Sequence, residues 1–256
     1  HSPLFEISWC VLLYTTVLVI EVSPDLLKFL PWRWPVRLVG WLMMPVTIIG
    51  VTLSTLHQST LGTLYLNMPY RLHALWYTPA LPLLFYVSSI MAGLSLGALA
   101  YRFAMRVQEK EEAPQVVHGL LTGAALVALL YGLLKLGELL WAGELNLLFT
   151  SGFMGALWGI ELGCCVLLPL LLWSVPALRQ RKVVQFSVPA LFLAGVLMNR
   201  FDATLFGQVL PEGVETYSPH LLEWLSTAGI LAGVVLVWLV AVRLLARDAR
   251  RPVEHQ

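Results

Sequence analysis

Charged residues are scarce in this chain of 256 residues. Asp, Glu, Lys and Arg make up only 12% of it and apolar residues 58%, whereas a soluble domain has about a quarter charged residues and somewhat under half apolar ones. This composition excludes a cytosolic enzyme, a secreted disulfide scaffold and a disordered chain, and it favours a polytopic membrane protein. The formal net charge is only +1, which suggests no nucleic-acid partner.

Cysteine is nearly absent as well. The three cysteines are Cys10, Cys164 and Cys165, and none has the C-x-x-C spacing of a zinc or iron–sulfur ligand pair. We therefore expect them to be apolar helix residues, and we expect neither a metal site nor an iron–sulfur cluster made by this chain alone.

Long apolar stretches recur along the whole chain. A transmembrane helix needs about 20 consecutive, predominantly apolar residues, and seven stretches meet that requirement. We therefore predict an all-α fold, a polytopic transmembrane helix bundle of about seven spans that forms a single membrane domain over residues 1–256. The predicted spans lie near residues 4–23, 38–61, 79–101, 116–141, 152–174, 184–201 and 219–243.

The basic residues are divided unequally between the two sides that these spans define. Arg71 and Arg200 lie on one side, Lys135 lies inside a span, and the other thirteen share the opposite side. Because loops rich in Lys and Arg stay in the cytoplasm, that side and the C-terminal tail are predicted to be cytoplasmic, and His1 to start outside. The thirteen residues are Lys28, Arg33, Arg37, Arg102, Arg106, Lys110, Arg179, Arg181, Lys182, Arg243, Arg247, Arg250 and Arg251.

Ionisable groups inside the spans are few, and most lie toward the outer side. Such groups are costly in lipid and usually face the bundle interior or a water-filled cavity. Lys135 and Glu138 are three residues apart, so they share a helix face and can pair. Glu161 lies near the middle of its span, and Glu21 near the inner end of its own. The other outer polar residues are Glu6, His57, Gln58, Asn199, Arg200, Asp202 and Glu223.

If these polar faces converge, they enclose a pocket that can hold a quinone headgroup. A quinone needs hydrogen-bond donors at its carbonyls, which His, Lys and Arg supply, and a proton route, which Glu, Asp and His supply. A proton path from Glu161 toward Glu21 is a weaker alternative, because only two carboxylates mark it. Plainer interpretations are a neutralising ion pair for Lys135 and Glu138, and ordinary exposure for the groups near the membrane surface.

The histidines predict no haem site. A b-type haem would need axial ligands on facing helices, and His57 has no partner histidine at its depth, because His118 lies at the cytoplasmic end of its span. The remaining histidines lie outside the hydrocarbon or in the tail. We therefore expect no haem in this chain.

One motif of the chain is LSTLHQSTLG at 53–62. It resembles L-x-T-x-H-Q-S-S-x-G, a signature in the polysulfide-reductase NrfD family, in particular in the HybB-type integral membrane subunits of periplasm-facing uptake nickel–iron hydrogenases. YRLHALWYTPALPLLF at 70–85 resembles a K-x-H-P-L-W element, with Arg71 for Lys and Ala74 for Pro. The further matching segments, in family order, are residues 1–24, LKLGELLW at 134–141, LWGIELGCCVLLP at 157–169 and YSPHLLEWLSTAGI at 217–230. Family members carry further membrane helices before the equivalent of His1, so the chain resembles the C-terminal two-thirds of such a subunit.

The resemblance implies a quinone-reactive membrane subunit of a multisubunit respiratory oxidoreductase in a prokaryotic cytoplasmic membrane. It implies menaquinone or ubiquinone as the bound substrate, no haem, a ferredoxin-like iron–sulfur partner on the outer face, and a catalytic subunit such as a nickel–iron hydrogenase. Site residues carried over on matched motifs are His57, Gln58, Lys135, Glu138 and Glu161. Those that rest mainly on depth are Asn199, Arg200 and Asp202, and Glu6 near the outer end of the first span is a further candidate.

Each of these residues has a predicted role. His57 and Lys135 donate hydrogen bonds to the quinone carbonyls, with Glu6, Gln58, Asn199 and Arg200 also binding the quinone. Catalysis is assigned to His57, Glu138, Glu161 and Asp202, of which Glu138 and Asp202 exchange protons with the outer side. Outer His73, Trp76 and Tyr77 are predicted to lie under the iron–sulfur partner. Two other hypotheses stay open: a proton-translocating module and a passive membrane anchor. The electron donor and the direction of transfer also stay open.

Overall fold

The computed structural model describes residues 2–27, 34–209, 217 and 219–249. Among the described residues, 84% are helical and none lies in a strand. Of the basic residues used to predict the topology, Lys28, Arg33, Arg250 and Arg251 lie outside the described residues. The prediction of an all-α fold is confirmed.

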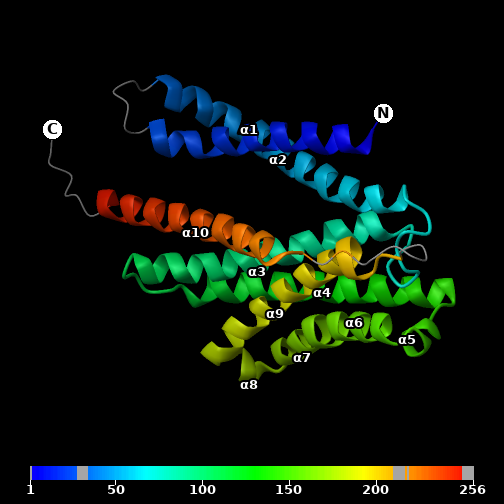
Figure 1. Ribbon diagram of the computed structural model, residues 1–256. Helices are drawn as coiled ribbons and strands as arrows, with labels where there is room; N and C mark the ends of the chain where they lie inside the picture. Colours follow the sequence, from blue (N-terminus) through cyan, green and yellow to red (C-terminus); the bar gives the residue numbers. More distant parts are fainter. Residues whose placement is uncertain (1, 28–33, 210–216, 218, 250–256) are drawn as a thin grey trace, which may run out of the picture.

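Seven helical segments in the described part are long and apolar enough to cross a membrane, as predicted (Figure 1). The fifth of them consists of α6, η1 and α7 and the sixth of α9 and η2, where η marks a π-helical segment. The elements are α1 (Pro3–Leu27), α2 (Trp34–Leu66), α3 (Leu81–Val107), α4 (Pro114–Ala142), α5 (Leu147–Thr150), α6 (Phe153–Leu162), η1 (Gly163–Leu167), α7 (Leu168–Ser174), α8 (Pro176–Arg179), α9 (Lys182–Phe201), η2 (Asp202–Phe206) and α10 (Leu221–Ala249).

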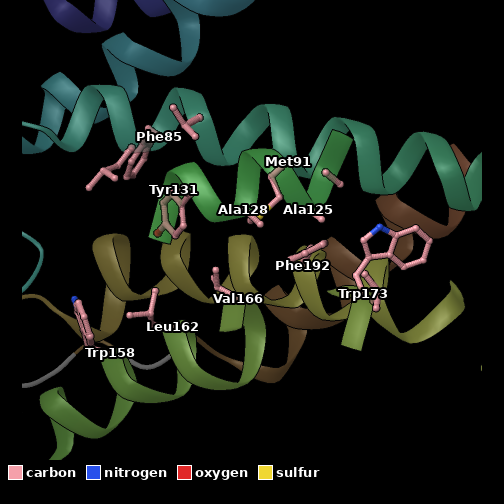
Figure 2. Packing of buried hydrophobic residues seen from close by; sticks show 14 of the residues in the cluster. Phe85, Met91, Ala125, Ala128, Tyr131, Trp158, Leu162, Val166, Trp173 and Phe192 are labelled. Carbon is pink, nitrogen blue, oxygen red and sulfur yellow. The ribbon is translucent and has the colours of Figure 1, made fainter. Parts of the chain in front are cut away.

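The core lies among α3, α4, α6–α7 and α9, which pack against one another. In each of these spans 39% of the residues in the most apolar stretch are buried, whereas the share is 11% or less in the spans of α1, α2 and α10. Figure 2 shows Tyr131 and Ala128 of α4 facing Leu162, Val166 and Phe192 across the bundle. These four spans therefore form a bundle in which polar groups can be kept from lipid.

The remaining spans lie beside this bundle. α1 packs along α2, and α2 packs on α3, as the blue and cyan ribbons of Figure 1 show. α10 touches α3, where the rings of Phe103 and Trp238 lie 5.9 Å apart. The apolar outer faces of α1, α2 and α10 are exposed, as expected for surfaces that lie in a bilayer.

Gly195 marks the closest approach of α9 to η1. A Cβ atom at this position would lie 2.6 Å from Cys165 Cβ and 3.3 Å from the Cys165 carbonyl oxygen. A neighbouring backbone leaves no room for a methyl group, so glycine is required here by packing, just as small residues allow close helix contacts in membranes generally.

Replacing Gly195 with alanine is therefore expected to destabilise the protein by about 1–3 kcal/mol, the usual effect of overpacking. The measurement is the unfolding temperature of the purified protein in detergent. Gly97→Ala on α3 is the matched control, because a Cβ there meets no atom within 4 Å, and it should leave stability unchanged or slightly raised. Equal unfolding temperatures for the two variants would contradict the packing argument.

The loop between α2 and α3, which the sequence predicts to lie on the outer side, is joined to the end of η2. The His73 N–H donates to the Gly207 carbonyl at 2.8 Å, and the Val209 N–H donates to the Arg71 carbonyl at 2.7 Å. Trp76 lies beneath this junction and is only 2% exposed. The prediction that Trp76 faces a partner subunit is therefore wrong, because its indole is part of the core that supports the loop.

Candidate functional site

A buried ion pair lies in the bundle. Lys135 Nζ of α4 lies 2.5 Å from Glu161 Oε2 of α6, and both side chains are almost completely buried. The sequence-based pairing of Lys135 with Glu138 is thus wrong: Glu138 lies on a half-buried part of α4 and has no described partner. A buried ion pair repays its desolvation only when further hydrogen bonds satisfy its remaining polar atoms.

Neighbouring side chains supply such contacts to Glu161. The Tyr131 hydroxyl donates to Glu161 Oε1 at 2.7 Å, and the Asn199 amide donates to the same oxygen at 3.2 Å. Lys135 Nζ also lies 5.2 Å from the centre of the Trp158 ring, a favourable distance for a cation–π contact. Three spans, α4, α6 and α9, therefore meet at this carboxylate.

Arg200 connects this pair to α3. Its guanidinium donates to Asn199 Oδ1 at 2.7 Å, to the Phe85 carbonyl at 2.9 Å and to the Ser88 hydroxyl at 3.0 Å. It also lies 3.7 Å from the centre of the Phe85 ring. The arginine is half-buried, so it extends from the bundle interior toward the face of α3.

Asp202, two residues after Arg200, has the most unusual environment of these polar residues. It is fully buried, yet neither carboxylate oxygen has a hydrogen-bond partner among the described residues. The sixth span was predicted to end near residue 201, but it continues through η2 to Phe206, so Asp202 lies inside it. We call Tyr131, Lys135, Glu161, Asn199, Arg200 and Asp202 the ionic cluster.

Both π-helical segments occur beside the ionic cluster. η1 begins two residues after Glu161, and η2 begins at Asp202 itself. A π-turn inserts an extra residue into a helix and is frequent at functional sites. Here the two π-turns follow the two buried acids, so the cluster coincides with the most irregular part of the bundle.

A second polar feature lies between α1, α2 and α3. It is a cavity of about 250 Å³. Its α2 wall includes Thr47, Gly50 and Ser54, and the next turn of the same face carries His57 and Gln58, because residues three or four apart share a helix face. The full lining is Tyr14, Glu21, Thr47, Gly50, Val51, Ser54, Thr55, Tyr86, Ser89 and Ile90.

His57 is half-buried on this face, and its Nδ1 atom is buried without a described hydrogen-bond partner. Farther along the same face, Tyr65 packs against the Phe85 ring at 6.0 Å. His57 therefore lies between the cavity and the contact of Phe85 with Arg200. An unpaired buried imidazole nitrogen is costly, and it is suited to a ligand that can pair with it.

A single turn of α3 contacts the cavity on one face and the ionic cluster on the neighbouring face. Tyr86 and Ser89 line the cavity, whereas Phe85 and Ser88, on the neighbouring face of the same turn, contact Arg200. The sequence indicated His57 and Arg200 but not these α3 residues or Tyr131. Tyr131 precedes Lys135 by four residues, and that spacing was the signal that could have found it.

The remaining predicted residues lie elsewhere. Glu6 is exposed on α1, outside both the cavity lining and the ionic cluster. His73 and Tyr77 line a cavity of about 530 Å³ beside the loop between α2 and α3, together with Glu144. Burial lowers the pKa of His73 below its usual value, and the nearby Glu144 carboxylate partly opposes that shift. His73 and Tyr77 thus stay accessible at this end of the bundle, unlike Trp76.

The sequence was then compared with known proteins. The family model described as "Polysulphide reductase, NrfD" matches residues 4–212, which include every span of the bundle. The chain belongs to the NrfD family. The ionic cluster and the cavity both lie within the matched residues.

Three relatives illustrate this NrfD membership. A protein of Nitratidesulfovibrio vulgaris is 36% identical over 93% of this chain and 63% of its own length. The probable Ni/Fe-hydrogenase 2 b-type cytochrome subunit of Escherichia coli is 28% identical over 96% of this chain and 63% of its own length. The menaquinone reductase, integral membrane subunit, of N. vulgaris is 29% identical over 96% of this chain and 65% of its own length. The chain thus spans less than two thirds of the length of these relatives.

The name of the E. coli relative includes a b-type cytochrome, whereas His57 and His118 of this NrfD chain do not fit a haem held between them. α2, α3 and α4 are successive spans, so α2 and α4 cross the membrane in the same direction. His57 lies near the end of α2 and His118 near the start of α4, which places them toward opposite sides. The absence of haem stays a prediction.

Proposed function

We propose that this protein is the quinone-reactive integral membrane subunit of a multisubunit respiratory oxidoreductase. The observation that carries the proposal is the buried Nδ1 atom of His57, which has no described hydrogen-bond partner. His57 lies on a polar face of α2, and α3 connects that face to the buried ionic cluster. We propose menaquinone or ubiquinone as the substrate. The name of one relative, a menaquinone reductase subunit, supports the quinone class, and the name of another, a hydrogenase subunit, supports membership of a redox complex.

In this proposal, His57 and Gln58 bind the quinone headgroup. Imidazole and amide N–H groups are hydrogen-bond donors, and both side chains lie on the α2 face that continues from the cavity. The isoprenoid chain would lie against the exposed apolar surface of α1 and α2. Lys135 is no longer a direct quinone ligand here, because its ammonium is held by Glu161.

The ionic cluster supplies fixed charge and exchangeable protons near this site. Arg200 is directed at the α3 turn beside the cavity and places positive charge where negative charge develops as a quinone accepts electrons. Asp202, buried and unpaired, and half-buried Glu138 are the proposed proton carriers toward the outer side. Glu161 holds Lys135 and Asn199 in position.

We place the iron–sulfur partner at the outer cavity lined by His73 and Tyr77, and the C-terminal tail in the cytoplasm of a prokaryotic cell. The positive-inside rule supports this orientation, because Arg102, Arg106 and Lys182 all lie on the side opposite that cavity. The partner would pass electrons to or from a catalytic subunit such as a nickel–iron hydrogenase.

The proposal predicts that the complex, purified gently from its native membranes, contains bound quinone and an iron–sulfur subunit. Solvent extraction with chromatography detects the quinone, and electron paramagnetic resonance detects the clusters. Donor-dependent reduction of a menaquinone analogue should accompany both. A complex that lacks quinone, clusters and this activity would instead be a passive anchor and would contradict the proposal.

A second candidate function is proton translocation, and the cavity that contains Glu21 favours it. The structure separates the two carboxylates of this hypothesis, because Glu161 is paired with Lys135 and does not line that cavity. The test is acidification of the lumen of proteoliposomes during turnover. If no proton gradient forms while quinone is reduced, this candidate loses its support.

A further inference from the structure

A basic cavity lies at the end of the bundle opposite the outer loop. It has a volume of about 580 Å³, and none of its lining residues is a carboxylate. An adjoining cavity of about 550 Å³ shares Pro114, Gln180 and Gln185 with it and adds Lys182 and Arg102. The only acids there are Glu111 and Glu112, and Glu112 is paired with Arg102 at 3.1 Å.

Buried Trp173 packs against two side chains at the wall of this cavity, those of Arg179 and His118. The Arg179 guanidinium lies 5.9 Å from the centre of the Trp173 ring and donates to the carbonyls of Trp173 and Ser174. On the other side, the His118 ring lies 5.3 Å from Trp173. The Thr122 hydroxyl is 3.3 Å from both Trp173 Nε1 and His118 Nδ1. The wall is therefore built by packing and hydrogen bonds rather than by loose surface side chains.

The ends of two long helices add to the positive potential. α4 begins at Pro114 and α9 at Lys182, and no side chain caps either end. Uncapped N–H groups and the helix dipole favour anions at such ends. The chain also has no acidic residue between Glu161 and Asp202, although Arg179, Arg181 and Lys182 lie in that interval.

We infer that these two cavities bind the phosphate headgroup of an anionic phospholipid. Basic pockets between transmembrane helices on the cytoplasmic side suit such headgroups, and the topology proposed from the basic residues puts this end of the bundle there. Exposed Val175 and Phe186 are next in sequence to the lining residues Pro176 and Gln185, and they offer apolar surface to acyl chains. The site does not depend on the quinone function, because it lies at the other end of the membrane.

The test is lipid-dependent thermal unfolding of the purified, delipidated complex in detergent. Cardiolipin should raise the unfolding temperature with saturation, whereas phosphatidylcholine should not. Lys182→Gln should weaken the apparent affinity for cardiolipin about fivefold, and Gln180→Glu at least as much, because one charge near the surface has roughly that effect. Gln180 is exposed and makes no described side-chain hydrogen bond, so its replacement tests charge without removing a contact.

Arg71→Gln is the matched control, since Arg71 is an exposed basic residue of the outer loop, and it should respond to cardiolipin as the parent protein does. Equal affinity in all four proteins would overturn the site. Inorganic phosphate that raises the unfolding temperature as much as cardiolipin would overturn the assignment to a lipid. A selective loss in Lys182→Gln and Gln180→Glu, with no response to phosphate, supports it.

Discussion

Replacing Glu161 with glutamine is expected to destabilise the protein by about 3–5 kcal/mol, because it leaves the Lys135 ammonium buried without its counter-charge. Glutamine keeps the size of the side chain, so the loss reports charge rather than a cavity. The Tyr131 hydroxyl can still donate to the amide oxygen. The measurement is reversible unfolding in mixed detergent micelles, or the unfolding temperature where refolding fails.

Two further variants separate the ion pair from other causes. The double variant Glu161→Gln, Lys135→Met removes both charges and should recover most of the lost stability, as neutral replacements of buried ion pairs usually do. Glu138→Gln makes the same chemical change at a half-buried position of α4 and should cost less than about 1 kcal/mol. A double variant no more stable than Glu161→Gln alone would contradict the argument.

Hydropathy was enough to predict the membrane spans. Lipid cannot satisfy backbone polar groups, so every crossing segment must be a helix of sufficient length and apolarity. The sequence records that requirement locally, and all seven segments are found in the structure. The core could not be assigned in this way, because the hydropathy of the bundle helices overlaps that of the flanking helices, and the most apolar span of all, that of α10, is a flanking one.

The partner of Lys135 could not be predicted from the sequence for the same reason. Spacing along α4 revealed only Glu138, whereas Glu161 reaches Lys135 because α6 is rotated to bring its carboxylate inward. Which face of a helix turns inward depends on its packing against other spans, and spacing along one helix does not record that packing. Local spacing therefore identified the right ionisable residues but joined the wrong two.

The depth of Asp202 was misjudged for a different reason. Arg200 and Asp202 lower the local hydropathy, so the predicted span ended at residue 201. In the structure the helix continues as η2 to Phe206, with Asp202 inside. Ending a predicted span at a charged residue gives the wrong boundary where the charged side chain is buried inside the bundle. Such intramembrane charges are often functional.

Replacing His57 with alanine is expected to reduce donor-dependent quinone reduction by about a hundredfold, the usual effect of removing a hydrogen-bond donor that stabilises developing negative charge. Stability and complex assembly should change little, because His57 is only half-buried and its Nδ1 atom has no partner to lose among the described residues. The measurement is turnover of the assembled complex with a menaquinone analogue, together with KM for that analogue.

His220→Ala is the matched control, because His220 is an exposed histidine just before α10, and it should leave turnover unchanged. His57→Gln keeps an N–H donor on the same α2 face and should restore part of the activity, which a purely structural role would not require. Glu138→Gln should slow turnover if this carboxylate carries protons outward. Unchanged turnover in both His57→Ala and Glu138→Gln would contradict the proposed site, because neither the quinone donor proposed on α2 nor the proton carrier proposed on α4 would then contribute to the reaction.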